Sequence, residues 1–246
     1  MSKTFERANR TWRGQFLTVT VGGIFLTLGF VLPVNAHKRD FVWTYEWFTP
    51  DKQEIEYEFW ATLQQNNGDD KEEYWLEVEV PVTGRWVIAP YLLMENGEGE
   101  AFQLKGWKVE QRYRFGEFTR GRFLPAAYVE VKKEKDEPYE MEAKAIFTRI
   151  RGDENITLNL IAEKALTAGE EIELEYAAGY SRTWNKRSRW SVETFGNLRK
   201  DTYYVGPGVA VDLNAAQRIV FNAAAGLNKR SDDIRLRLIF EHETWR

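Results

Sequence analysis

The stretch QEIEYEFWATL, residues 53–63, decides the fold class because its side chains alternate with a strict period of two. One row of alternate positions is apolar and holds Ile55, Tyr57, Phe59, Ala61 and Leu63. The other row is mostly polar and holds Glu54, Glu56, Glu58, Trp60 and Thr62. Successive side chains of a β-strand point to opposite faces, so the stretch predicts a strand with one apolar and one polar face.

The same alternation recurs along the rest of the chain. Eleven further runs show it, at 74–80, 85–93, 107–115, 126–132, 139–148, 155–163, 171–180, 189–195, 202–211, 218–227 and 234–240. Turn-forming clusters such as Thr83-Gly84 and Arg151-Gly152-Asp153 separate the runs. An aromatic run at 41–48 precedes them, but it has no clean polar face. The pattern predicts an all-β chain of 12 or 13 strands.

The start of the chain is typical of a secretory signal peptide. Four basic residues precede an apolar run at 16–34, which ends at the small-residue site Val34-Asn35-Ala36. We therefore expect residues 1–36 to be removed on export and residues 37–246 to form a single domain. An uncleaved membrane anchor is the alternative, because the apolar run approaches the ~17 residues needed to cross a bilayer.

Charge and cysteine content exclude several classes of function. The formal charge of the chain is −4, and residues 1–36 carry +3, so the exported part carries −7. An acidic chain without a long basic block is not expected to bind nucleic acid. The sequence contains no cysteine, which excludes disulfides and thiolate metal sites.

Alternation alone does not say which face lies inside. The apolar face is the core of a soluble β-sandwich, but it meets lipid in an outer-membrane barrel. Twelve strands closing around an apolar interior would leave a large void. The 10 Trp, 11 Tyr and 15 Phe, many of them near strand ends, also fit the aromatic girdles of membrane barrels. We therefore predict an antiparallel up-and-down transmembrane β-barrel of about 12 strands, with a soluble periplasmic β-sandwich or barrel that binds a ligand as the alternative.

Strand number and loop length refine this prediction. Bacterial single-chain barrels have an even number of strands, so the run at 41–48 is an extra element or one later run is wrongly divided. The gaps near 49–53 and 82–84 are short, while those at 64–73 and 94–103 are long. Short turns face the periplasm in such barrels, which would place Pro50 on the periplasmic side.

Near the C-terminus, Tyr204-Val205-Gly206-Pro207 is followed by a Gly226-Leu227 turn with Ser231, Asp232 and Asp233, and then by alternating Arg and apolar residues at 234–238. This part resembles the end of exported bacterial outer-membrane barrels of the transporter or porin-like type. The opening at 39–58 is similar to the first hairpin of such chains. One departure is that Trp245 is penultimate and out of phase with Phe240, whereas such barrels often end on an aromatic residue.

The resemblance implies a place in the outer membrane of a Gram-negative bacterium, with the periplasm as the alternative. It implies lipid and the barrel-assembly machinery as partners, and passage of small polar or charged solutes without a cofactor. The proposed lumen wall consists of the charged residues on the polar rows, Glu54, Glu56, Glu58, Arg112, Arg114, Glu140, Glu142, Lys144, Glu171, Glu173, Glu175, Arg235 and Arg237. Their excess of Glu predicts a preference for cations in an open pore.

Catalytic and metal-binding candidates are few, and we expect no enzyme activity. The two histidines, His37 and His242, lie in no recognisable nucleophile or zinc motif. A hydrolase would need a nucleophile beside a base, such as Ser191 or Ser231 beside His242. If the chain is cut after Ala36, the amine and ring of His37 could bind copper together with His242, so these two histidines are the only metal candidates.

Overall fold

The computed structural model describes residues 39–66, 70–96 and 102–245. The predicted signal peptide and His37 lie outside the described residues. The described part contains twelve strands, β1 (Glu54–Gln65), β2 (Lys71–Thr83), β3 (Trp86–Asn96), β4 (Gln103–Arg114), β5 (Phe123–Glu134), β6 (Tyr139–Arg151), β7 (Glu154–Ala165), β8 (Glu173–Asn185), β9 (Ser188–Asn197), β10 (Thr202–Asp212), β11 (Gln217–Gly226) and β12 (Ile234–Trp245). No helix among the described residues is long and apolar enough to cross a membrane.

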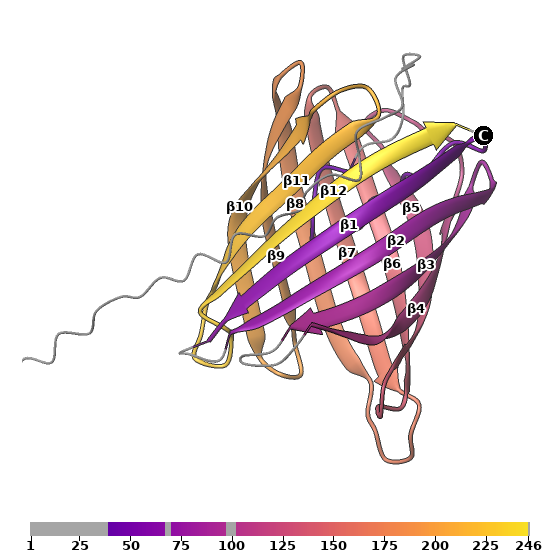
Figure 1. Ribbon diagram of the computed structural model, residues 1–246. Coiled ribbons are helices and arrows are strands. Elements are labelled where there is room, and N and C mark those ends of the chain that lie inside the picture. The colour runs from indigo at the N-terminus through magenta and orange to yellow at the C-terminus, as the bar shows by residue number, and fades with distance from the viewer. Residues whose placement is uncertain (1–38, 67–69, 97–101, 246) are drawn as a thin grey trace, which may run out of the picture. The chain divides into compact units, whose positions relative to one another are not determined.

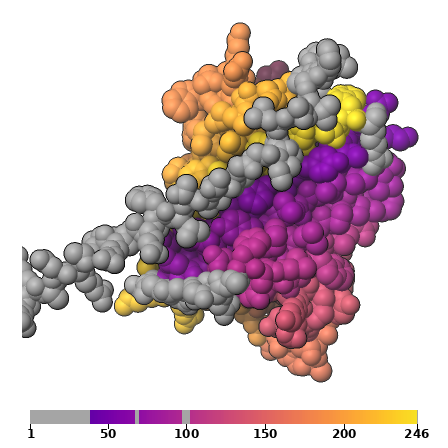
Figure 2. Space-filling view, viewed as in Figure 1, coloured from indigo at the N-terminus to yellow at the C-terminus, as the bar shows by residue number. Residues whose placement is uncertain are grey.

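The strands close into one antiparallel barrel (Figure 1). Each strand pairs with the next along the chain, and β1 pairs with β12 from Glu54 opposite Trp245 to Gln65 opposite Ile234. Figure 2 shows these first and last strands side by side, in indigo and yellow. The closed sheet confirms the predicted up-and-down barrel and rules out the β-sandwich. The run at 41–48 is no strand, so the strand count is even.

The two faces of the sheet are oriented as predicted. On β1, the side chains of Glu54, Glu56 and Glu58 are at most 4% exposed, whereas Tyr57 between them is 43% exposed. The same outward row continues around the barrel with large apolar residues, including Leu76, Leu92, Val129, Leu158, Leu160 and Val192. The outward rows are therefore apolar and charged side chains point into the barrel, which is the reverse of a water-soluble barrel. The inward row of β3, with Val87, Ala89, Tyr91 and Leu93, is apolar as well.

The apolar core lies inside the lumen and is built around the chain that precedes β1. A barrel of twelve strands encloses more space than the side chains of its wall fill. Residues 39–50, which we call the inner segment, occupy part of this space and are almost fully buried. Tyr45 and Trp47 of the inner segment pack in one cluster with Trp60, Tyr91 and Tyr128 of the wall. The aromatic run at 41–48, which resembles a strand in the sequence, thus fills part of the lumen instead.

Candidate functional site

Polar side chains of the barrel wall hold the backbone of the inner segment. The side-chain oxygen of Asn159 on β7 accepts a hydrogen bond from the Tyr45 N–H at 2.7 Å, and its amide donates to the Tyr45 carbonyl at 2.8 Å. The Thr148 hydroxyl on β6 accepts from the Trp47 N–H at 3.0 Å. A buried backbone group costs free energy when it has no partner. These side chains therefore replace the neighbouring strand that the inner segment lacks.

Glu193 on β9 binds the middle of the inner segment. Its carboxylate accepts the backbone N–H groups of Val42, Trp43 and Thr44 at 3.0, 2.8 and 2.9 Å. Successive backbone N–H groups that converge in this way form a small site for an anion. The side chain of Glu193 fills that site and fixes the local bend of the segment.

Asp40 anchors the start of the inner segment to four side chains of the wall. Its carboxylate accepts hydrogen bonds from Asn155 at 3.0 Å and Ser181 at 2.7 Å. It also forms ion pairs with Arg189 at 2.9 Å and Arg218 at 3.5 Å. These partners come from β7, β8, β9 and β11, so one carboxylate connects a third of the wall to the segment.

Ring packing completes the attachment. The indole of Trp43 stacks on Phe195 with ring centroids 4.3 Å apart. The ring of Phe41 lies against the backbone of Gly179, where a Cβ atom would come within 2.6 Å of it. A glycine is thus required at this position of β8 for the inner segment to lie in the lumen as it does.

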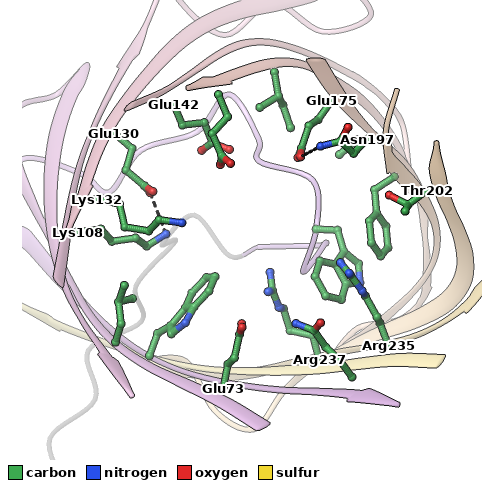
Figure 3. Close-up of a pocket in the computed structure, with 18 of the residues that line it drawn as sticks. Glu73, Lys108, Glu130, Lys132, Glu142, Glu175, Asn197, Thr202, Arg235 and Arg237 are labelled. Atoms are coloured by element: carbon green, nitrogen blue, oxygen red, sulfur yellow. Dashed lines mark hydrogen bonds and ion pairs between the residues drawn. The ribbon is translucent and has the colours of Figure 1, made fainter. Parts of the chain in front are cut away.

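A cavity of about 480 Å³, which we call the vestibule, opens at the end of the barrel where β1 ends and β2 begins. Trp43 and Tyr45 of the inner segment contribute to its lining. Figure 3 shows side chains from many strands pointing into it. Its charged lining consists of Lys71, Lys105, Lys108, Lys132, Lys144, Lys200, Arg235 and Arg237, and of Glu73, Glu95, Glu130, Glu134, Glu142, Glu163 and Glu175. Eight basic and seven acidic groups make the vestibule nearly neutral but highly polar.

Four cations of the vestibule, Lys108, Lys144, Arg235 and Arg237, lie over aromatic rings. Lys144 has its ammonium 4.0 Å from the centroid of the Tyr45 ring and 2.9 Å from the Glu142 carboxylate. Arg237 has its guanidinium carbon 3.8 Å from the centroid of the Trp43 ring. Lys108 is placed similarly over Tyr91. Such contacts fix the positions of charged groups that would otherwise sample many rotamers. The charged groups on the side of the vestibule next to the inner segment are therefore already held in place.

Twelve of the predicted lumen residues lie on inward-facing rows of the barrel. Glu142, Lys144, Glu175, Arg235 and Arg237 line the vestibule, and Glu140 and Glu173 bind its lining residues Lys132 and Lys200. Glu58, Arg112 and Arg114 hold partners inside the barrel. Glu56 lies beside the carboxylates of Glu58 and Glu241, and Glu54 accepts the backbone N–H of Asp51 in the turn before β1. Glu171 differs, because β8 begins only at Glu173 and the exposed Glu171 forms an ion pair with Arg199 outside the strand.

Sequence reasoning missed several lumen residues that the same rule could have found. Glu77, Glu79 and Glu241 continue the polar rows of their strands and are 1% exposed. No sequence pattern predicts that Asn159 and Glu193 bind the inner segment, because their partners lie more than a hundred residues away in the sequence.

The histidine and serine candidates do not come together. His242 lies on the outward row of β12, opposite Tyr57 and Gln217. Ser191 faces the lumen from β9, and Ser231 precedes β12 at its other end, where it binds the backbone of Tyr203. Neither Ser191 nor Ser231 therefore lies beside His242 as a nucleophile beside its base.

The chain matches no protein-family model, and no curated protein matches its sequence. Solved structures are similar to it in fold. An outer-membrane channel from Pseudomonas putida F1 matches with a TM-score of 0.60 at 8% identity, over 79% of this chain and 96% of that one. The chain has the fold of the outer-membrane porins. The KdgM porin, solved in complex with disordered oligogalacturonate, matches with a TM-score of 0.57 at 8% identity, over 78% of this chain and 99% of that one. The NanC porin matches with a TM-score of 0.56 at 7% identity, over 78% of this chain and 99% of that one.

Proposed function

We propose that the protein is an outer-membrane channel for small polar or charged solutes, closed in this structure by its own inner segment. The observation that carries the proposal is the orientation of the closed barrel, with apolar rows outside and charged rows inside. An apolar outer surface is stable in lipid, and a charged lumen is suited to hydrated solutes. The predicted lumen residues are then the wall of the pathway.

A place in the outer membrane is supported by the same orientation of the barrel's apolar and charged rows. A closed barrel satisfies its backbone hydrogen bonds without water, which is the condition for a β-sheet to span a bilayer. The strands contain 10 to 13 residues, which suits a tilted strand that crosses a membrane. We propose that the ends of β1 and β3 at Gln65 and Asn96 face the exterior and that the turn before β1 faces the periplasm. We also propose that the barrel-assembly machinery inserts the chain.

The inner segment is proposed to act as the gate. The vestibule extends from one end of the barrel to Trp43 and Tyr45. On the other side of the segment lies a cavity of about 10 Å³, near the size of one water molecule. Passage of a solute then requires the segment to leave its place. An enzyme function has less support, because His242 faces outward, away from Ser191.

Liposome swelling tests the proposal. Asn159→Ala removes both hydrogen bonds to Tyr45, a loss of about 2 kcal/mol at about 1 kcal/mol for each bond. We expect vesicles containing this variant to swell at least tenfold faster in small sugars and salts than vesicles containing the wild type, because about 1.4 kcal/mol changes an equilibrium constant tenfold.

The matched control is Asn66→Ala, which changes an exposed asparagine in the connection after β1. Vesicles that contain this variant should swell at the same rate as vesicles that contain the wild type. The proposal is wrong if folded Asn159→Ala passes no solute, or if washing cells without detergent releases the wild-type protein.

A further inference from the structure

Five carboxylates gather on one wall of the lumen, on the side of the inner segment away from the vestibule. They belong to three adjacent strands and form what we call the glutamate cluster, Glu56, Glu58, Glu77, Glu79 and Glu241. Each of these residues is at most 4% exposed. Like charges that are buried together repel strongly, so a cation must compensate them or some must bind protons.

The cation that compensates them here is Arg39 of the inner segment. Its guanidinium lies 3.2 Å from Glu58, 3.7 Å from Glu79 and 3.6 Å from Glu241. It also lies over the ring of Trp60, 4.9 Å from the centroid. The inner segment therefore places a tethered positive charge among the glutamates of the wall.

Arg39 does not saturate the glutamate cluster. Within the described residues, neither carboxylate oxygen of Glu241 has a hydrogen-bond partner, and one oxygen each of Glu77 and Glu79 also has none. Besides Arg39, Arg112 forms an ion pair with the cluster, through Glu79. Arg218 lies opposite Glu241 across the sheet, and it forms its ion pairs with Asp40 and Asp212. Five carboxylates facing three guanidinium groups leave an excess of negative charge.

The spacing of the oxygens suits a metal ion. Oxygens of Glu56, Glu58 and Glu241 all lie within 4.8 Å of one another, and so do oxygens of Glu58, Glu77 and Glu79. Three oxygens at such distances all lie within about 2.8 Å of a common point, so small side-chain rotations bring them to the 2.3–2.6 Å that is usual between Ca²⁺ and oxygen. The cavity of about 10 Å³ lies directly beside Arg39, Glu56, Glu58 and Glu79.

We propose that the glutamate cluster is a binding site for Ca²⁺, and that Arg39 occupies this site while the inner segment is in place. This inference rests on the proposed function, in which the segment leaves the lumen. When the segment leaves, Arg39 leaves with it, and the five carboxylates keep Arg112 and Arg218 of the wall as their compensating charges. The site is then open to a divalent cation.

Competition between Arg39 and Ca²⁺ has a direct consequence for the gate. A ligand that binds one of two states shifts the equilibrium toward that state. Ca²⁺ binds the glutamate cluster after Arg39 has left it, so Ca²⁺ favours release of the inner segment. The site thereby makes Ca²⁺ both a candidate solute of the channel and an activator of its opening.

Thiol labelling measures this effect. The chain contains no cysteine, and Thr44 of the inner segment is fully buried, so Thr44→Cys gives one thiol that reacts when the segment leaves the lumen. In refolded full-length protein, saturating Ca²⁺ should raise the labelling rate of this thiol at least tenfold over NaCl of equal ionic strength. Adding Glu241→Gln should reduce the Ca²⁺ effect to less than twofold, whereas Glu170→Gln, at an exposed glutamate, should leave it unchanged.

Calorimetric titration with Ca²⁺ gives a second readout. Arg39→Gln removes the competing guanidinium and should bind Ca²⁺ at least tenfold more tightly than the wild type. Lys52→Gln makes the same change of charge at an exposed position just before β1 and should bind like the wild type. If Arg39→Gln does not refold, the labelling of Thr44→Cys decides alone.

The proposal is overturned if NaCl accelerates labelling as much as Ca²⁺ does, if Glu241→Gln keeps the full Ca²⁺ effect, or if Arg39→Gln binds no more tightly than Lys52→Gln. Neither readout depends on the passage of a solute. A protein that binds Ca²⁺ as described but leaves liposomes impermeable would contradict the proposed channel function and keep the site. A permeable protein without the Ca²⁺ effect would contradict the site alone.

Discussion

At the scale of single residues, Gly179 shows how closely the wall fits the inner segment. A Cβ atom at this position would come within 2.6 Å of the Phe41 ring, which is fully buried. We expect Gly179→Ala to push Phe41 away and loosen the segment, because overpacking costs about 1–3 kcal/mol. The labelling rate of Thr44→Cys should then rise by roughly tenfold, since about 1.4 kcal/mol is a factor of ten.

Gly84→Ala is the control for this substitution. A Cβ atom at Gly84, in the turn between β2 and β3, meets no atom within 4 Å. The labelling rate should stay at the value of the unsubstituted Thr44→Cys protein. Equal rates for Gly179→Ala and Gly84→Ala would show that Phe41 does not hold the segment.

At the scale of elements, the inner segment differs from every strand because side chains of the wall hold its backbone. Such an element can open without unfolding the barrel. In hydrogen exchange measured by mass spectrometry, we expect peptides covering 41–48 to exchange faster than peptides of β1. Asn159→Ala should accelerate exchange in 41–48 and leave β1 unchanged. Exchange of both regions at one common rate would instead mean that the segment opens only with the whole barrel.

The strands could be predicted from sequence, whereas the inner segment could not. Glu56 and Tyr57 lie on opposite faces because a strand forces alternate side chains apart, and this rule needs no knowledge of the partner strand. Trp43 and Trp47 follow no such rule, because the segment lies inside the lumen and its partners are Glu193 and Thr148 of distant strands. One sign of an extra element is present in the sequence: it contains 13 runs, whereas bacterial single-chain barrels have an even number of strands.

The alternation of side chains also does not predict where a strand begins and ends. Glu171, Glu173 and Glu175 continue one period of two, yet β8 begins at Glu173. Periodicity describes which side chains share a face, but pairing with a neighbour decides where a strand begins. Glu163 of β7 lies opposite Glu173, at the last pair of the ladder between β7 and β8, so Glu171 has no partner residue across the sheet.

At the scale of the whole molecule, the orientation of the barrel predicts how its stability depends on lipid. Leu160 near the middle of β7 and Leu166 just beyond its end are both 52% exposed. In lipid vesicles, Leu160→Arg should lower the free energy of unfolding by about 2–4 kcal/mol, because it places a charge near the bilayer midplane. Leu166→Arg should cost only about 0–1 kcal/mol, because it lies near the interface.

Urea unfolding of both variants in the same vesicles makes the comparison. Equal losses of stability would mean that the outward row of β7 does not lie in hydrocarbon, and the membrane orientation would then be wrong.

Single-channel recording in planar bilayers tests the central claim, a porin-fold channel closed by its own inner segment, most directly. The wild type should show long closed periods with rare openings, and Asn159→Ala should raise the open fraction by about tenfold or more, as expected for the loss of about 2 kcal/mol. The unit conductance of the open state should be nearly the same in both proteins, because the substitution changes one uncharged side chain of the wall. A wild-type channel that is open all the time, or an Asn159→Ala variant that folds, inserts and never conducts, would contradict the account.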